Sequence, residues 1–515
     1  MLNRAGLHIY HSHPHGRLGE ELYRGLAGGI IVNDGEEAKL ALPAGEYEIP
    51  VVLQDRRFDA QNQLVFGAMM HDQMMGFYGD KILVNGRPNL ELEVASRAYR
   101  LRFLNGSNAR IYKLGWSDGT PMTVIGTDGG LLEKPEHRPY LMLAPGERLD
   151  VWADFSGRPK GTELTLRSLP FKGVLPKMAE RMMHGGMGGG EGGMGGIGRG
   201  MMGGGGMGGR MMGMMGAMSL PVGSDFPLFK LRVTRETSDS PNLPTRLSSF
   251  KRYTLDEVAN RNKPIPLGIS EAPRAMLLNG RPYAFNDVQP YERVPVNSVQ
   301  LLEIFHAHGG GGGHGGGDGA AAASSGSHGA EATAEKKDGG MVGHQMGGGG
   351  MGMGGGMMGG GMMGGMGHGT MGGGGMGGMG GMNHGAQGGG GSDGGMSHGG
   401  GEGQGTGMGM MGGGMMGGGM GGMGGGMMFS MAHPIHLHGQ QFEVISRTIG
   451  ADEAEDYATI KDGLIDSGLK DTVLVMPGEK VRIIKPFSDF KGLFMYHCHN
   501  IEHEDMCMMR EFLVE

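Results

Sequence analysis

The chain has 515 residues, of which 112 are glycine and 50 are methionine. Glycine makes up about one residue in five, against ~7% in ordinary soluble proteins. The formal net charge is −8 and there is no block rich in Lys and Arg, which argues against a nucleic-acid partner. No apolar run reaches the roughly 20 residues of a membrane helix, and two cysteines are too few for a disulfide scaffold.

The excess glycine and methionine is concentrated in two stretches, 182–218 and 308–428. Neither stretch shows helical or strand periodicity, and glycine at this density cannot offset its backbone entropy by burial. We expect both to be disordered, low-complexity inserts. The rest of the chain has ordinary composition and is long enough for two domains of ~150 residues and part of a third.

The sequence outside the inserts is typical of an all-β protein. Short runs rich in Val, Ile, Leu and Phe alternate with Gly, Pro and Asn turns, which predicts β-sandwiches or barrels. The clearest strand candidates are 46–58, 80–88, 97–110, 146–155, 479–487 and 508–515. The N-terminus has no signal-peptide pattern, and 25–34 looks like the closing strand of a domain. The chain therefore begins as if partway through a fold.

The C-terminal motif HCHNIEHEDMCMM predicts metal sites on both sides of one strand. Side chains alternate between the two faces of a strand, so His497 and His499 share one face while Cys498 points to the other. The Cys498 thiolate, His503 and a weak axial thioether from Met508 need one more imidazole. Two His, one Cys and a distant Met form the ligand set of a blue-copper site.

Two further histidine clusters supply candidate ligands. In HPIHLHG, His436 and His438 share a face if the segment is extended, and His433 can complete the Cys498 site. The third cluster is the pair His11 and His13. A lone pair of this kind lies more often on a surface, and a lone cysteine is more often an inert buried thiol. The two C-terminal motifs together, however, match a complete type of metal site.

These motifs carry a family resemblance. HPIHLHG and HCHNIEHEDMCMM resemble the two C-terminal copper motifs of multicopper oxidases, and IYHSHPHG with GLAGGIIVND resembles the second N-terminal copper motif and the end of the first cupredoxin domain. The nearest subgroup is the bacterial copper-efflux or copper-resistance oxidases. The resemblance implies tandem cupredoxin-like β-sandwiches: a remnant of domain 1 at 1–40, domain 2 at 41–235 and domain 3 at 250–515.

The resemblance also implies a set of copper ligands, carried over residue by residue. The type 1 copper would be bound by His433, Cys498, His503 and Met508. The type 2 copper would be bound by His436, and the type 3 pair by His11, His13, His438, His497 and His499. Electrons would pass from the type 1 copper through Cys498 to the other centres, with up to four copper ions in the full-length parent. Glu504 matches a carboxylate that relays protons in the family; the alternative is a solvated surface acid.

The activity implied is oxidation of Cu(I) or phenolic donors coupled to four-electron reduction of dioxygen to water, in copper tolerance and in the periplasm. Met431 matches a ligand for substrate Cu(I), although Phe429 replaces the subgroup's acidic partner. Thioether sulfur prefers Cu(I), so the inserts would collect that ion. The alternative is a low-complexity expansion without selective binding. The rival functions are a laccase-like phenol oxidase and a non-enzymatic copper-binding or sequestering protein.

One departure from the family concerns its first His-x-His-Gly motif, which has no counterpart upstream of His11. Eight family-matched copper-binding histidines are present instead of ten. The simplest interpretation is a truncated or mis-started gene product, with the true start and export signal upstream. A type 2 site with His436 as its one protein imidazole should hold copper poorly. We therefore expect residues 1–515 to show weakened or no dioxygen reduction.

Overall fold

The computed structural model describes residues 4–67, 70–177, 179–180, 220–272, 275–306 and 430–515. The inserts expected at 182–218 and 308–428 lie entirely outside the described residues. All described residues fall within one of two compact units, formed by Met1–Gly313 and Gly419–Glu515. Everything below refers to that unit.

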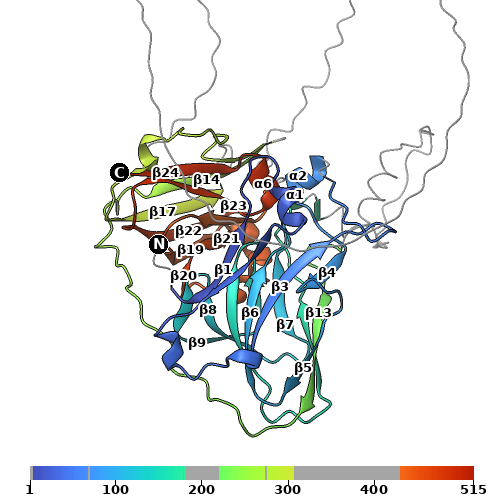
Figure 1. The fold of residues 1–515 in the computed structure, drawn as a ribbon. Helices are drawn as coiled ribbons and strands as arrows, with labels where there is room; N and C mark the ends of the chain where they lie inside the picture. The colour runs from blue at the N-terminus through green and yellow to red at the C-terminus, as the bar shows by residue number, and fades with distance from the viewer. Residues whose placement is uncertain (1–3, 68–69, 178, 181–219, 273–274, 307–429) are drawn as a thin grey trace, which may run out of the picture. The chain divides into compact units, whose positions relative to one another are not determined.

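The N-terminal hairpin is made of β1 (Gly6–His11), α1 (Leu18–Tyr23) and β2 (Ala27–Val32). The two strands pair antiparallel, from Gly6 opposite Val32 to His11 opposite Ala27. Helix α1 packs Leu18 and Leu22 against Ile501 of α6 (Ile501–Asp505), at the other end of the chain. Figure 1 shows α1 in blue beside α6 in red. This contact anchors the segment that carries His11 and His13 next to the C-terminal histidines.

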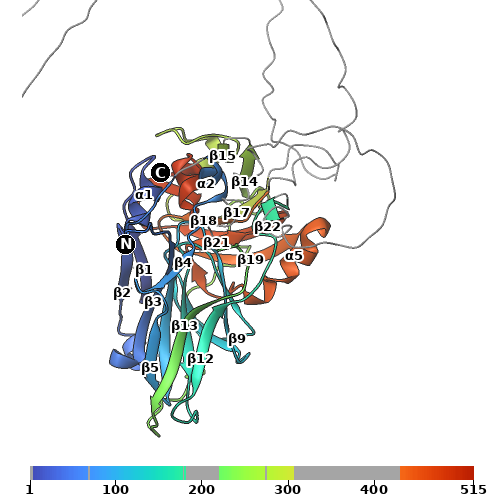
Figure 2. The same cartoon turned by 90° about the vertical axis from the view of Figure 1, so that its right-hand side faces the viewer.

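The middle sandwich consists of two sheets that share one apolar core. The five-stranded sheet runs, in spatial order, β10 (Leu141–Leu143), β7 (Tyr112–Trp116), β12 (Glu163–Ser168), β13 (Phe226–Arg235) and β5 (Glu91–Ala95). The six-stranded sheet runs β4 (Lys81–Val84), β3 (Glu48–Arg56), β6 (Ala98–Asn105), β11 (Arg148–Asp154), β8 (Met122–Thr127) and β9 (Gly130–Arg138). Figure 2 shows β12, β13 and β5 running alongside one another.

The C-terminal sandwich repeats this arrangement. Its six-stranded sheet runs β15 (Ala275–Leu278), β14 (Ile265–Ala272), β17 (Ser298–His306), β22 (Glu479–Phe487), β19 (Phe442–Ile449) and β20 (Leu469–Lys470). Its five-stranded sheet runs β16 (Arg293–Val294), β24 (Met509–Val514), β23 (Gly492–Cys498), β18 (His433–Leu437) and β21 (Thr472–Val475). The apolar core between these sheets includes Cys498, Met431 and Met508.

Helices are short and lie in the connections. Besides α1 and α6, the described α-helices are α2 (Met70–Met75) and α5 (Ala454–Ala458). The 3₁₀ turns are Glu37–Lys39, Gly45–Tyr47, Pro290–Glu292, Ala451–Glu453 and Lys461–Gly463. None of the described helices has the length and apolar character needed to cross a bilayer.

The all-β fold class is confirmed. Each of the segments expected to form strands contains one, because alternating β-branched and aromatic residues between turn residues suit a half-buried pleated surface. These strands are β3, β4, β6, β11, β22 and β24. The domain boundaries at 40, 235 and 250 stay predictions.

Candidate metal centres

The first candidate centre is the thiolate pocket, formed by His433, Cys498, His503 and Met508. His433 opens β18, Cys498 ends β23 and His503 lies in α6, so neighbouring elements of one sandwich supply the group. The Cys498 Sγ lies 3.5 Å from His433 Nδ1 and 3.6 Å from His503 Nδ1. His433, Cys498 and His503 offer ligand atoms that all lie within 4.8 Å of one another. The structure thus brings together the sulfur and both imidazoles predicted to share a copper ion.

Burial prepares these groups for a metal ion. Cys498, His433 and His503 are all 0% exposed. Burial lowers the pKa of His503 to about 3 and also lowers the pKa of His433, so both rings stay neutral and keep a lone pair for a metal. Burial raises the pKa of the Cys498 thiol. Because the thiolate is the ligand form, a bound cation is what would hold this sulfur deprotonated.

The outer nitrogen of each imidazole has a partner that orients the ring. His433 Nε2 lies 3.0 Å from Glu271 Oε1, and His503 Nε2 lies 3.1 Å from the carbonyl oxygen of Met74. The backbone N–H of Asn500 donates to Cys498 Sγ at 3.3 Å. Metal-binding histidines commonly donate their second N–H to a carboxylate or carbonyl in this way. The pocket therefore has the partners around its ligands that a metal site needs.

Met508 lies in the same buried apolar cluster as Cys498 and is 0% exposed. Its carbonyl oxygen accepts the backbone N–H of Cys498 at 3.1 Å. Two imidazoles, a thiolate and a methionine from the same buried cluster match the donor set of a blue-copper site, so the residues present fit copper.

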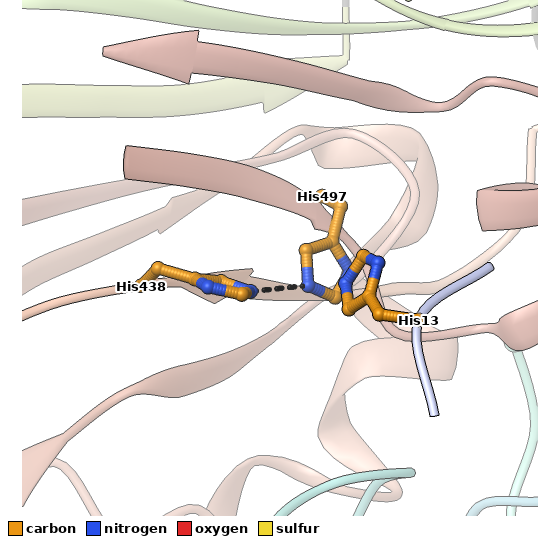
Figure 3. A group of neighbouring side chains, drawn as sticks. All are labelled: His13, His438 and His497. Atoms are coloured by element: carbon orange, nitrogen blue, oxygen red, sulfur yellow. Dashed lines mark hydrogen bonds between the residues drawn. The ribbon is translucent and has the colours of Figure 1, made fainter. Parts of the chain in front are cut away.

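The second candidate centre is the imidazole cluster on the other side of β23, formed by His11, His13, His436, His438, His497 and His499. Three of these rings, His13, His438 and His497, converge from a loop after β1, from the end of β18 and from β23, as Figure 3 shows. Their ligand atoms all lie within 4.8 Å of one another. His438 Nε2 and His497 Nε2 are 3.1 Å apart. Two imidazole nitrogens at this distance can both bind the same metal ion.

The other rings of the cluster lie beside this triad. The His11 ring centroid is 5.4 Å from that of His499. The His436 ring centroid is 5.2 Å from that of His497 and 5.8 Å from that of His499. The structure therefore brings together all the histidines predicted to bind the type 2 and type 3 coppers, as a convergent triad, a pair and a single ring.

Glu504, in α6, bridges two members of the triad. Its Oε1 lies 3.0 Å from His13 Nε2 and its Oε2 lies 3.0 Å from His497 Nδ1. Its side chain is 1% exposed, so it is no solvated surface acid. Burial raises the pKa of Glu504, but His497 and His13 outweigh it and hold that pKa well below its usual value. Glu504 is therefore an ionised carboxylate that contacts two rings of the cluster.

Sequence reasoning missed two acidic residues at these centres. Glu271, near the end of β14, accepts hydrogen bonds from Ser430 Oγ at 3.0 Å and from the Met431 backbone N–H at 2.8 Å, besides contacting His433. Glu271 thus brings a carboxylate next to His433. In the subgroup that the sequence resembles, the acidic residue is expected at the position of Phe429, which lies outside the described residues. Asp471 lies 3.5 Å from His436 Nδ1. No sequence signal marked either residue. Asp471 directly precedes β21, which pairs with the strand of His436, and Glu271 reaches His433 from the other sheet of the sandwich.

Met431 is buried, at 1% exposure, in the core that contains Cys498. Cys507, the second cysteine of the chain, is free and has a backbone φ of 71°. The role of Met431 as a Cu(I) ligand stays a prediction.

Comparisons with known proteins agree with this arrangement. A family model described as multicopper oxidase matches residues 424–515. The chain is 45% identical over 151 residues to cell division protein FtsP of Xenorhabdus nematophila, covering 28% of this chain and 31% of that protein. It is 37% identical over 158 residues to a laccase of Bacillus stratosphericus, covering 28% of this chain and 31% of the laccase. The chain thus spans about a third of the length of the curated relatives it matches.

Solved structures extend the likeness along the whole chain. The McoA multicopper oxidase of the hyperthermophile Aquifex aeolicus superposes with a TM-score of 0.59 at 23% identity, covering 100% of this chain and 77% of that one. A metallo-oxidase of Campylobacter jejuni superposes with a TM-score of 0.55 at 19% identity, covering 99% of this chain and 72% of that one.

The fold and the two centres define a cupredoxin-like protein with donor sets suited to copper. Residues 424–515 match the multicopper oxidase family model, and the described residues have the fold of the solved multicopper oxidases. The family resemblance seen in the sequence motifs is confirmed.

Proposed function

We propose that this protein is an oxidase that couples one-electron oxidation of Cu(I) or phenolic donors to four-electron reduction of dioxygen to water. The observation that carries the proposal is the position of Cys498. Its sulfur belongs to the thiolate pocket, while its chain neighbours His497 and His499 belong to the imidazole cluster. Strand alternation places adjacent side chains on opposite faces, so one short covalent path joins the two centres.

The donor sets support assigning different coppers to the two centres. Type 1 copper fits the thiolate pocket, type 2 copper fits His436, and the type 3 pair fits the remaining rings of the imidazole cluster. Bound there, copper would supply the one-electron chemistry that links the donor to dioxygen. The protein would contribute imidazole nitrogens, a buried thiolate pocket and the Glu504 carboxylate, which contacts two of the rings and would relay protons for the water that forms.

Copper in the imidazole cluster is expected to be held weakly in residues 1–515. The triad of His13, His438 and His497 offers three nitrogens, but His11 with His499 offers two, and His436 stands alone. We therefore propose that dioxygen reduction by this chain is impaired. Expression of residues 1–515, a count of bound copper and an oxygen-consumption assay test this. About four coppers per chain with normal turnover would contradict the impairment.

Cu(I) is the donor that we favour, because the described residues on either side of the second Gly/Met stretch lie beside the thiolate pocket. His306 and Ser430, the described residues that flank it, lie 3.6 Å and 3.0 Å from Glu271. Val174, shortly before the first stretch, accepts the backbone N–H of Ala432 at 3.0 Å. Methionines tethered there would deliver Cu(I) close to His433 and Met431.

Deletion of 182–218 and 308–428 tests this donor assignment. We expect the rate of Cu(I) oxidation and the affinity for Cu(I) to fall while the rate of phenol oxidation is kept, because the described fold contains both centres. Equal rates of Cu(I) oxidation before and after deletion would favour a laccase-like phenol oxidase.

A non-enzymatic copper-binding protein is the second candidate, and the burial of the thiolate pocket favours it. That pocket is complete within one sandwich and needs nothing from the N-terminal hairpin. A copper-loaded protein that shows the blue absorption band but consumes no oxygen would support this candidate. A role in copper tolerance and a periplasmic location are part of the main proposal, and a role in cell division would follow only from the relatives named FtsP.

A further inference from the structure

A hydrogen-bonded chain ends on His436, the ring proposed for type 2 copper. Thr472 Oγ1 donates to Asp471 Oδ1 at 2.9 Å and lies 3.0 Å from His436 Nδ1. Since the hydroxyl hydrogen goes to Asp471, the hydroxyl oxygen accepts the hydrogen on Nδ1. This leaves Nε2 of His436 as the nitrogen with a free lone pair. Through the Thr472 hydroxyl, the Asp471 carboxylate thus favours the tautomer of His436 that carries its hydrogen on Nδ1 and can bind a metal through Nε2.

Asp471 is held in place by Arg148, the first residue of β11 in the middle sandwich. Arg148 Nη1 donates to Asp471 Oδ1 at 2.8 Å, and Nη2 donates to Oδ2 at 2.6 Å. The Arg148 side chain is 2% exposed and that of Asp471 is 14% exposed. A bidentate pair of this kind fixes the plane of the carboxylate as well as its position.

The same guanidinium contacts the other chain segments that supply the imidazole cluster. Its Nε donates to the carbonyl oxygen of Leu7 in β1 at 3.0 Å, four residues before His11. Its Nη1 also donates to the carbonyl oxygen of Gly146 at 2.8 Å. Gly146 lies against His499, since a Cβ built there would be 2.7 Å from the ring. Arg148 therefore contacts or adjoins the segments that carry His11, His436 and His499.

We propose that Arg148 and Asp471 are positioning residues for the copper held by His436. The middle sandwich supplies none of the proposed copper ligands, yet through Arg148 it sets the orientation of one ligand and the distance between the segments that carry the others. This inference rests on the proposed function, since it concerns copper binding at the imidazole cluster. The alternative is an ion pair that only joins the two sandwiches.

The test compares Asp471→Asn with a matched variant, Asp466→Asn, in the full chain. Asp466 also forms a bidentate pair, with Arg447 at 2.7 Å and 3.0 Å, but it contacts none of the histidines in the described structure. Copper uptake is followed by electron paramagnetic resonance, which reports the non-blue copper, and by the blue absorption band, which reports the thiolate pocket. Thermal unfolding of the copper-free proteins measures the structural cost of each change.

We expect both variants to lose stability, but only Asp471→Asn to bind the non-blue copper ~10–100-fold more weakly, with an altered spectrum. Arg148→Lys, which keeps the charge but loses the bidentate fork, should give a smaller change in the same direction. The blue band should be kept throughout. Wild-type affinity and spectrum in Asp471→Asn, or an equal loss in Asp466→Asn, would overturn the inference. A wild-type chain that takes up no copper would instead overturn the proposed function together with the inference.

Discussion

The thiolate pocket and the imidazole cluster lie on either side of β23, but the chain assembles them differently. The pocket takes its side chains from 433–508 within one sandwich, and its Cys and His side chains are 0% exposed. The cluster needs His11 and His13 from the N-terminal hairpin, and the His13 and His436 side chains are 27% and 17% exposed. The comparison indicates that the pocket depends on local folding, while the cluster depends on the docking of distant segments.

The largest expected effect follows from weakening the packing of the N-terminal hairpin against α6. Leu18, at 2% exposure in α1, packs with Leu22 against Ile501 of α6. Leu18→Ala should cost ~2–5 kcal/mol of stability. Because α1 holds the segment with His11 and His13, copper should be lost from the imidazole cluster while the blue band of the thiolate pocket remains. Copper counting with absorption and paramagnetic resonance spectra measures both.

Leu228→Ala is the control for this change. Leu228 is 3% exposed in the core of the middle sandwich, away from α1. It should cost a similar free energy and leave copper in both centres. Equal copper loss in the two variants would show that the cluster responds to general destabilisation. It would contradict the conclusion that the cluster depends on the packing of the N-terminal hairpin.

A smaller effect is expected from Gly146→Ala. Gly146 has a φ of +78°, and an added Cβ would lie 2.7 Å from His499 Cδ2. Gly157 has a φ of +73° with nothing within 4 Å of the added Cβ. Both substitutions should cost ~1–3 kcal/mol through backbone strain. Only Gly146→Ala should also weaken copper binding at the cluster, since it displaces His499; equal copper affinity in the two variants would contradict this.

The smallest effect on copper is expected at Lys485. Burial lowers the pKa of Lys485 to about 7, although Asp471 and Asp489 oppose the shift. In the unfolded chain the pKa of lysine is ~10.4. Between these values the unfolded state holds the proton and the folded state does not, so stability rises with pH by about 1.4 kcal/mol per pH unit.

Lys485→Met should remove that rise and leave the blue band unchanged. Urea unfolding of both proteins between about pH 7 and about pH 10 measures the difference. Parallel pH dependence in the two proteins would show that the Lys485 amine titrates normally.

Much of the fold could be predicted from sequence because its determinants are local. Alternating apolar residues and turn residues marked β3, β6 and β22. Two short motifs placed His433, Cys498 and His503 close together, since all three belong to adjacent elements of one sandwich. The side chains do meet, while their roles as copper ligands stay predictions.

The supporting residues could not be predicted, since they arrive through long-range pairing. Glu271 reaches His433 because the sheet that contains β14 packs against the sheet that contains β18. Arg148 reaches Asp471 across the contact between two sandwiches, more than 300 positions along the chain. Neither residue belongs to a motif, and strand order is not encoded in any single segment. A buried ion pair of this kind becomes visible only when the sheets are placed together.

The central claim is that Cys498 belongs to a copper site distinct from the one served by its neighbours. Copper titration of the wild-type chain and of Cys498→Ser, followed by visible absorption and paramagnetic resonance, tests it directly. We predict that the wild type develops a blue band that Cys498→Ser lacks, while the variant still binds copper through its imidazoles. A blue band in Cys498→Ser, or none in the copper-loaded wild type, would contradict the account.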